Sequence, residues 1–181
     1  MRARFAHTTA TVEYAGLFEE VRASAFGRLL AFAGRLLGTP VAPRSGRNVL
    51  ATVRVSPVPG GCAWDRRYCW HDGSNSMVCS IKVIDEEGHL IEKLPARLCM
   101  PLKVYEHRGA LHFESEGYYF ELFRRRGRPL RLALPHWLSP GVTRVEHRDL
   151  GGGWFRFTLC VEHPRWGELF FQSGRFRTAG G

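Results

Sequence analysis

From about Arg47 onward, apolar and polar residues alternate along this chain. The stretch "VLATVRV" places Val49, Ala51, Val53 and Val55 on one face, and similar alternation recurs up to about residue 176. Turn sequences rich in Gly, Pro and Asp, such as "PVPGG", "DEEGH" and "DLGGG", separate the alternating segments. This pattern is typical of antiparallel strands joined by hairpins. We therefore predict antiparallel β-structure over residues 48–176.

Residues 13–37 show a different spacing. In "EYAGLFEEVRASAFGRLLAFAGRLLG", Leu17, Val21, Leu29 and Leu36 lie near one helical stripe, and Gly38 ends it. The spacing predicts a helix, interrupted by glycines, that covers the core. The alternative is a helix lying on a membrane surface, because Phe, Leu and Arg dominate its second half.

Together these patterns predict an α+β fold. We expect a strongly curved antiparallel β-sheet or β-barrel of about eight strands, with the N-terminal helix packed on it. No linker or composition shift divides the sequence, so residues 1–181 are expected to form a single domain.

Composition indicates the class of protein and its cellular compartment. Hydrophobic residues make up 44% and charged residues 24%, as in ordinary globular proteins, and no apolar run is long enough to span a membrane. The first sixteen residues contain no apolar core of a secretory signal, and the five cysteines are an odd number. These features predict a cytoplasmic protein with reduced cysteines.

The stretch "CAWDRRYCW" is the first candidate site. Trp64, Arg66, Tyr68 and Trp70 occupy every second position, so a strand places them on one face. The opposite face is more polar, which predicts that the aromatic face points inward. Rigid aromatic walls around a fixed positive charge suit an apolar ligand with an acidic or carbonyl group.

A buried arginine needs an acidic partner, because an unpaired buried charge is costly. Arg66 therefore has two interpretations. It forms an internal ion pair, with Glu92 or Glu146 as candidates, or it anchors a ligand.

Acid–base catalysis on the same pocket is a further alternative. His112 and Glu114 share a strand face, and with Glu92 they are the candidate acid–base residues of a small isomerase-type or cyclase-type enzyme. The sequence contains no P-loop, no G-x-S-x-G and no H-E-x-x-H, and no Cys or His spacing matches a zinc site. We therefore predict no cofactor and no metal.

The net charge of +9 introduces a third class of partner. Of the 26 basic residues only three are lysines, and the densest run is Arg124, Arg125, Arg126 and Arg128. Such a run is a solvated loop or an anion-binding patch. Binding to a polyanion or to a membrane surface is an alternative function. Nucleic acid is not the expected partner, since no nucleic-acid-binding module is recognisable.

Short motifs along the chain resemble a known family. A W-x-R-x-[FY] motif is followed by a serine, then by L-x-E, G-x-L, L-P, a proline, a glutamate, F-x-F, P-x-x-G and a late glycine. These match Trp64, Arg66, Tyr68, Ser76, Leu90, Glu92, Gly109, Leu111, Leu134, Pro135, Pro140, Glu146, Phe155, Phe157, Pro164, Gly167 and Gly174.

The order of these motifs, from about Phe26 to Phe176, resembles domain-of-unknown-function family 4166. The resemblance implies a bacterial domain that occurs alone or fused behind saccharopine-dehydrogenase-like oxidoreductases. It implies an oxidoreductase as a partner, but no hydride transfer by this chain, which has no dinucleotide-binding half.

The function predicted from the sequence is binding of a small apolar molecule with an acidic or carbonyl group. An accessory role beside an oxidoreductase is an extension of this prediction, and the pathway is unspecified. The candidate ligand-binding residues are Trp64, Arg66, Tyr68, Trp70, Glu92, His112 and Glu114.

Overall fold

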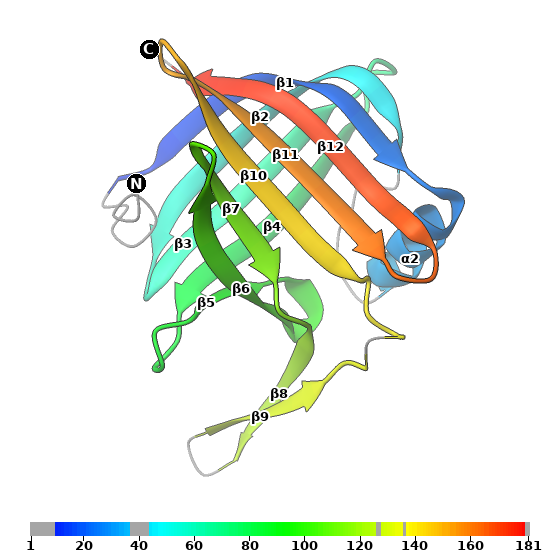
Figure 1. Ribbon diagram of the computed structural model, residues 1–181, viewed down its shortest axis with the longest axis vertical. Helices are drawn as coiled ribbons and strands as arrows, with labels where there is room; N and C mark the ends of the chain where they lie inside the picture. Colours follow the sequence, from blue (N-terminus) through cyan, green and yellow to red (C-terminus); the bar gives the residue numbers. More distant parts are fainter. Residues whose placement is uncertain (1–9, 37–43, 126–127, 136, 180–181) are drawn as a thin grey trace.

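The computed structural model of this chain is an antiparallel β-barrel (Figure 1). It describes residues 10–36, 44–125, 128–135 and 137–179. Of its twelve strands, β8 and β9 lie outside the closed ring, so ten form the barrel. Their order is β5-β4-β3-β2-β1-β12-β11-β10-β7-β6, and β6 pairs with β5 to close the ring.

The barrel strands follow one another along the chain with short turns. They are β1 (Val12–Ala23), β2 (Gly46–Val58), β3 (Gly61–Cys69), β4 (Asn75–Ile84), β5 (Leu90–Lys93), β6 (Leu98–His107), β7 (Ala110–Ser115), β10 (Val142–Gly151), β11 (Trp154–His163) and β12 (Gly167–Thr178). The predicted antiparallel barrel is confirmed. The predicted number of about eight strands is wrong, because β1 and the four-residue β5 lie outside the segments that the alternation identified.

The predicted helix over residues 13–37 is wrong in its first half, where β1 forms instead. The physical reason is a β-bulge between Phe18 and Glu20. A bulge adds one residue to a strand and so changes which side chains point inward. Phe18 and Val21 are both buried although they are three residues apart, which resembles helical spacing.

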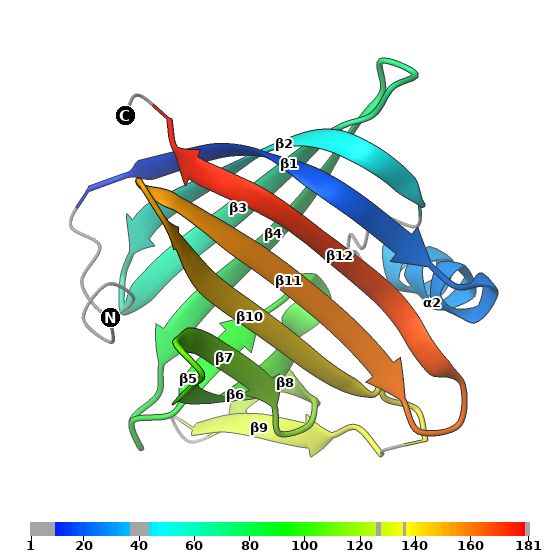
Figure 2. The same ribbon diagram turned by 45° about the horizontal axis from the view of Figure 1, so that its top comes forward.

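The helix α2 (Ala25–Leu36) does not cover the sheet, so its predicted packing is also wrong (Figures 1 and 2). Its beginning is fixed to the barrel end. Ser24 N–H donates to the Leu169 carbonyl at 3.0 Å, and the Phe26 ring lies 3.9 Å from the Trp166 ring. A one-turn 3₁₀ helix, η1 (Pro95–Arg97), links β5 to β6. In the described ranges no helix is long and apolar enough to cross a membrane.

The hairpin of β8 (Tyr119–Arg125) and β9 (Arg128–Ala133) projects from the barrel (Figure 1). Strand β8 runs antiparallel to β6 and pairs with it only at Leu98↔Phe120 and Cys99↔Tyr119. The rest of β8 therefore extends past the beginning of β6, away from the ring. The predicted arginine run falls at the tip of this hairpin, where side chains 124–128 lie outside the described residues.

Two apolar clusters occupy opposite walls of the barrel interior. The larger is centred on Phe18, Val49 and Phe176 of β1, β2 and β12. The smaller includes Leu102 and Phe113 of β6 and β7. Their side chains alternate with outward-facing ones, as the pleat of a strand requires. The interior between these clusters contains the candidate site.

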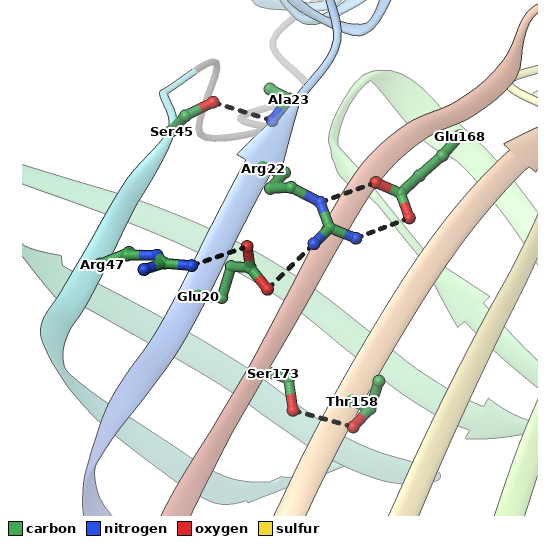
Figure 3. Close-up of polar contacts among 8 residues, drawn as sticks. All are labelled: Glu20, Arg22, Ala23, Ser45, Arg47, Thr158, Glu168 and Ser173. Carbon is green, nitrogen blue, oxygen red and sulfur yellow. Dashed lines mark hydrogen bonds and ion pairs between the residues drawn. The ribbon is translucent and has the colours of Figure 1, made fainter.

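Ion pairs connect neighbouring strands on the outer face (Figure 3). The Arg22 guanidinium donates two hydrogen bonds to the Glu168 carboxylate, each 3.0 Å long, and pairs with Glu20 at 2.9 Å. These carboxylates raise the pKa of Arg22, the Glu168 hydrogen bonds most of all. Beside them, Thr158 and Ser173 share a hydroxyl hydrogen bond of 3.2 Å. Polar side chains thus link β1, β12 and β11 across the outer face.

Candidate ligand site in the barrel interior

The aromatic residues of β3 line the inside of the barrel. Trp64, Tyr68 and the following Trp70 are all buried. Tyr68 stacks between Phe18 of β1, at 5.2 Å between ring centroids, and Trp70, at 6.0 Å. The inward orientation predicted for this face is confirmed. It places Arg66, on the same face, among aromatic rings.

Arg66 meets an acidic partner there. Its Nη2 lies 3.5 Å from Glu92 Oε1, and its Nη1 donates to Ser80 Oγ at 3.3 Å. Glu146, the other candidate partner, lies on β10 with its carboxylate on Arg148 Nε at 2.9 Å. The internal ion pair of Arg66 is therefore with Glu92.

Glu92 is shared with a second cation, Lys82. Lys82 faces Glu92 directly across β4 and β5, with Nζ 3.0 Å from Oε2. The side chains of Arg66, Lys82 and Glu92 are only 11%, 9% and 9% exposed. In the described part of the chain no second carboxylate pairs with either cation. Two buried cations thus share one carboxylate, and the cluster has a formal charge of +1.

The ionisation of Glu92 follows from these neighbours. Burial alone raises the pKa of a carboxyl group, but Lys82 and then Arg66 outweigh it and lower the pKa of Glu92 to about 2. Burial also lowers the pKa of Lys82, and the charge of Arg66 adds to this effect, while Glu92 opposes it. When Lys82 is protonated, the site holds two cations and one carboxylate, and a bound anion would offset the excess positive charge.

His147 adds a neutral imidazole to the interior. It lies on β10 opposite Phe157, with ring centroids 5.2 Å apart, and 5.7 Å from the Phe113 ring. Burial first, and then the repulsion by the charges of Lys82 and Arg66, lower its pKa to about 3. At neutral pH His147 can accept or donate a hydrogen bond without charge.

Two uncharged polar side chains of the aromatic wall have hydrogen-bond partners. Tyr68 Oη donates to Gln172 Oε1 at 3.0 Å, and Trp70 Nε1 donates to Ser76 Oγ at 2.8 Å. Ser76 is the serine that follows the W-x-R-x-[FY] motif, and its hydroxyl fixes the Trp70 indole. The positive charge of the cluster is therefore the chief unbalanced feature of this interior.

The interior is not completely filled. Val53, Val78, Val145 and Leu159 belong to inward-facing rows, yet each remains only partly buried. A ring of ten strands is also wider than one of eight, whose interior side chains can just fill. Solvent therefore reaches part of these inward-facing rows.

Residues 1–176 match a family model described as a domain of unknown function, DUF4166. The chain belongs to this family. No curated protein and no solved structure matches it. For this DUF4166 domain, any statement about function must therefore come from the site itself.

Two of the predicted site residues lie on the other side of the DUF4166 barrel wall. His112 and Glu114 alternate with the inward Leu111 and Phe113, so they face outward. His112 stacks on Tyr105 at 5.2 Å, and Glu114 accepts from Arg144 Nε at 3.2 Å. They occupy the convex face, so they cannot act together with Glu92 as one acid–base group.

The structure therefore brings together five of the seven predicted residues, which are Trp64, Arg66, Tyr68, Trp70 and Glu92. Sequence reasoning missed Lys82 and His147. The sequence could have indicated that His147 points inward, because it shares its strand face with Val145 in a predicted hairpin. Nothing in the sequence indicates that Lys82 points inward. The alternation in β4 favours the apolar face of Met77 and Ile81 as the inward face, but both residues are exposed.

Two other surface features of this DUF4166 domain lie away from the cluster. A groove of about 810 Å³ on the outer wall is lined mainly by apolar groups, among them Leu17, Leu50 and Trp154. On the β4–β5 turn, ligand atoms of Asp85, Glu87 and His89 lie within 4.8 Å of one another. Asp85 Oδ1 there accepts the backbone N–H groups of the other two, which accounts for the turn without an ion.

Proposed function

We propose that this domain binds a small apolar molecule with an acidic or carbonyl group inside the barrel. The observation that supports it best is the sharing of Glu92 by Arg66 and Lys82. A buried cluster with one excess cation is costly, and an anionic or strongly dipolar ligand group removes that cost. The tryptophan walls would contact the apolar body of the ligand.

The cations of the proposed site lie next to an aromatic ring of its wall. Lys82 Nζ lies 4.9 Å from the Trp64 ring centroid and the Arg66 guanidinium lies 5.8 Å from it. Both cations thus lie close to one aromatic ring. A ligand carboxylate or carbonyl oxygen that reaches this face finds preorganised donors, which reduces the entropy cost of binding.

Native mass spectrometry of the freshly purified protein tests the proposal first. An adduct that is lost on denaturation supplies the mass of the natural ligand. A matched ligand pair then tests the role of charge. We expect 2-naphthoate, an apolar anion, to bind more tightly than 2-naphthylmethanol, which has the same ring system without charge. Equal affinity of the two compounds would contradict the anion site.

Acid–base catalysis in the same interior is the second candidate function, and His147 is the observation that favours it. Its imidazole is neutral at neutral pH, and the charges of Lys82 and Arg66 are near enough to lower its pKa. Glu92 is a weak candidate base, because its pKa of about 2 reflects a stabilised carboxylate. A His147→Gln variant that still binds ligand but no longer converts it would establish this role.

The accessory role beside an oxidoreductase stays a proposal that rests on family resemblance. Co-purification of this chain with an oxidoreductase encoded in the same organism would support it. Ligand binding by the isolated barrel does not depend on that partner.

A further inference from the structure

One end of the barrel exposes large apolar side chains from three separate segments. This end contains the last residues of β1 and β11 and the first residues of β6, β10 and β12. Helix α2 follows β1 there, the β8–β9 hairpin extends past the beginning of β6, and the loop around Trp137 leads into β10. Figures 1 and 2 show α2 to the right of the ring, and the hairpin leaving the ring near the beginning of β6 and projecting below it.

The exposed side chains are large. Phe32 of α2 is 62% exposed, Phe123 of β8 is 62% exposed and Trp137 is 68% exposed. Leu29, Leu132 and Leu138, on the same three segments, are more than half exposed. Scattered single apolar residues are ordinary on a protein surface, but six on three segments at one end indicate an interaction surface. We call these six residues the apolar end.

The segments that carry the apolar end are strongly basic. By sequence, α2 and the hairpin contain seven arginines and one acidic residue, Glu121. Glu121 is compensated by Lys93, whose Nζ lies 3.1 Å away. A second copy of this chain would bring the same positive charge against itself. The charge therefore favours an anionic partner over self-association.

We propose that the apolar end docks on the surface of a membrane with anionic lipids. Trp, Phe and Leu on projecting segments can enter the headgroup region, and the net positive charge of the same segments attracts lipid phosphates. Each basic residue near such a surface adds to the attraction, which salt weakens. A hairpin that extends beyond the barrel suits this role, because it reaches a flat surface without obstruction from the strands. This inference is independent of the ligand proposed for the interior.

Vesicle co-sedimentation tests the docking surface directly. We expect the full chain to bind vesicles of phosphatidylcholine with phosphatidylglycerol, and to bind pure phosphatidylcholine far less. The variant Phe123→Ser/Trp137→Ser should lower the affinity for anionic vesicles roughly tenfold, because two interfacial anchors are removed. The matched control is Ile84→Ser/Trp154→Ser, which removes two exposed apolar residues at the opposite end and should bind like the wild type.

A depth measurement separates insertion from simple charge attraction. Brominated acyl chains quench tryptophan only when the indole reaches the membrane. We expect quenching of the wild type that falls in Trp137→Phe and is retained in Trp154→Phe. Absence of binding to anionic vesicles, or equal loss in both double variants, overturns the proposal. An acidic protein then becomes the partner to look for at this end.

Discussion

Lys82 Nζ lies 3.0 Å from Glu92 Oε2, on the carboxylate oxygen that Arg66 does not contact. The pair is buried inside a ring of β-strands and is joined by a second cation. The carboxylate is therefore fully used by the protein, while the positive charge is not. This imbalance is the basis for the proposed ligand site.

Replacement of Glu92 should be strongly destabilising. Glu92→Gln leaves two buried cations without a counter-charge, and removal of one partner from a buried pair costs about 3–5 kcal/mol. Urea unfolding measures the loss. The control Glu114→Gln breaks an exposed pair with Arg144 and should cost at most about 1 kcal/mol. Similar losses for the two variants would show that the interior cluster is well solvated.

The stability of the protein should fall when the pH is lowered from 7 to 5, in part because of His147. The folded-state pKa of His147 is lowered to about 3, so the unfolded chain binds a proton at pH 5 that the folded chain does not. Unfolding is then favoured by about 2 kcal/mol at pH 5 relative to pH 7.

The variant His147→Phe should therefore lose less free energy of unfolding over this pH range than the wild type. His112→Phe, which changes an outward-facing histidine, is the matched control. An unchanged pH profile in His147→Phe would mean that the imidazole is readily protonated in the folded barrel. Below pH 4.5 Glu92 adds a loss of the same sign, because its folded-state pKa of about 2 lies below its ordinary value.

The hydrogen bond between Tyr68 and Gln172 should contribute to the rigidity of the aromatic wall. Tyr68→Phe leaves the buried Gln172 amide without this partner, which should reduce the free energy of unfolding by about 1–3 kcal/mol. Thermal or urea unfolding measures this change. The double variant Tyr68→Phe/Gln172→Leu should recover part of the loss. Additive losses would argue against a direct coupling between the two side chains.

The sequence predicts the larger part of the barrel, because most strands have one buried face and distinct turns. The hairpin β10–β11 forms where the alternation and the turn "DLGGG" place it. The prediction for β1 is wrong because the bulge after Phe18 interrupts the alternation of inward and outward residues. The resulting spacing from Phe18 to Val21 resembles that of a helix. These residues form a strand because they pair with β2 and β12, and such pairing is not visible in a local sequence pattern.

The candidate site is only partly predictable for a related reason. Arg66 is recognisable because aromatic residues flank it on its own strand. Lys82 is hidden because β4 turns its polar face inward, against the usual alternation. A buried lysine is explained only by its partner Glu92, on a neighbouring strand whose register the sequence does not reveal.

The most direct test of the interior site is the affinity of 2-naphthoate for three proteins: the wild type, Lys82→Met and Lys103→Met. Ligand-observed NMR titration measures each affinity. Lys82→Met removes the excess cation and leaves the Arg66–Glu92 pair, whereas Lys103 lies on an outward position of β6. We predict that Lys82→Met weakens 2-naphthoate binding roughly tenfold or more, the scale of one lost charge-assisted hydrogen bond, and leaves 2-naphthylmethanol unaffected. Lys103→Met should match the wild type. Equal 2-naphthoate affinity in all three proteins would contradict an anion site inside the barrel.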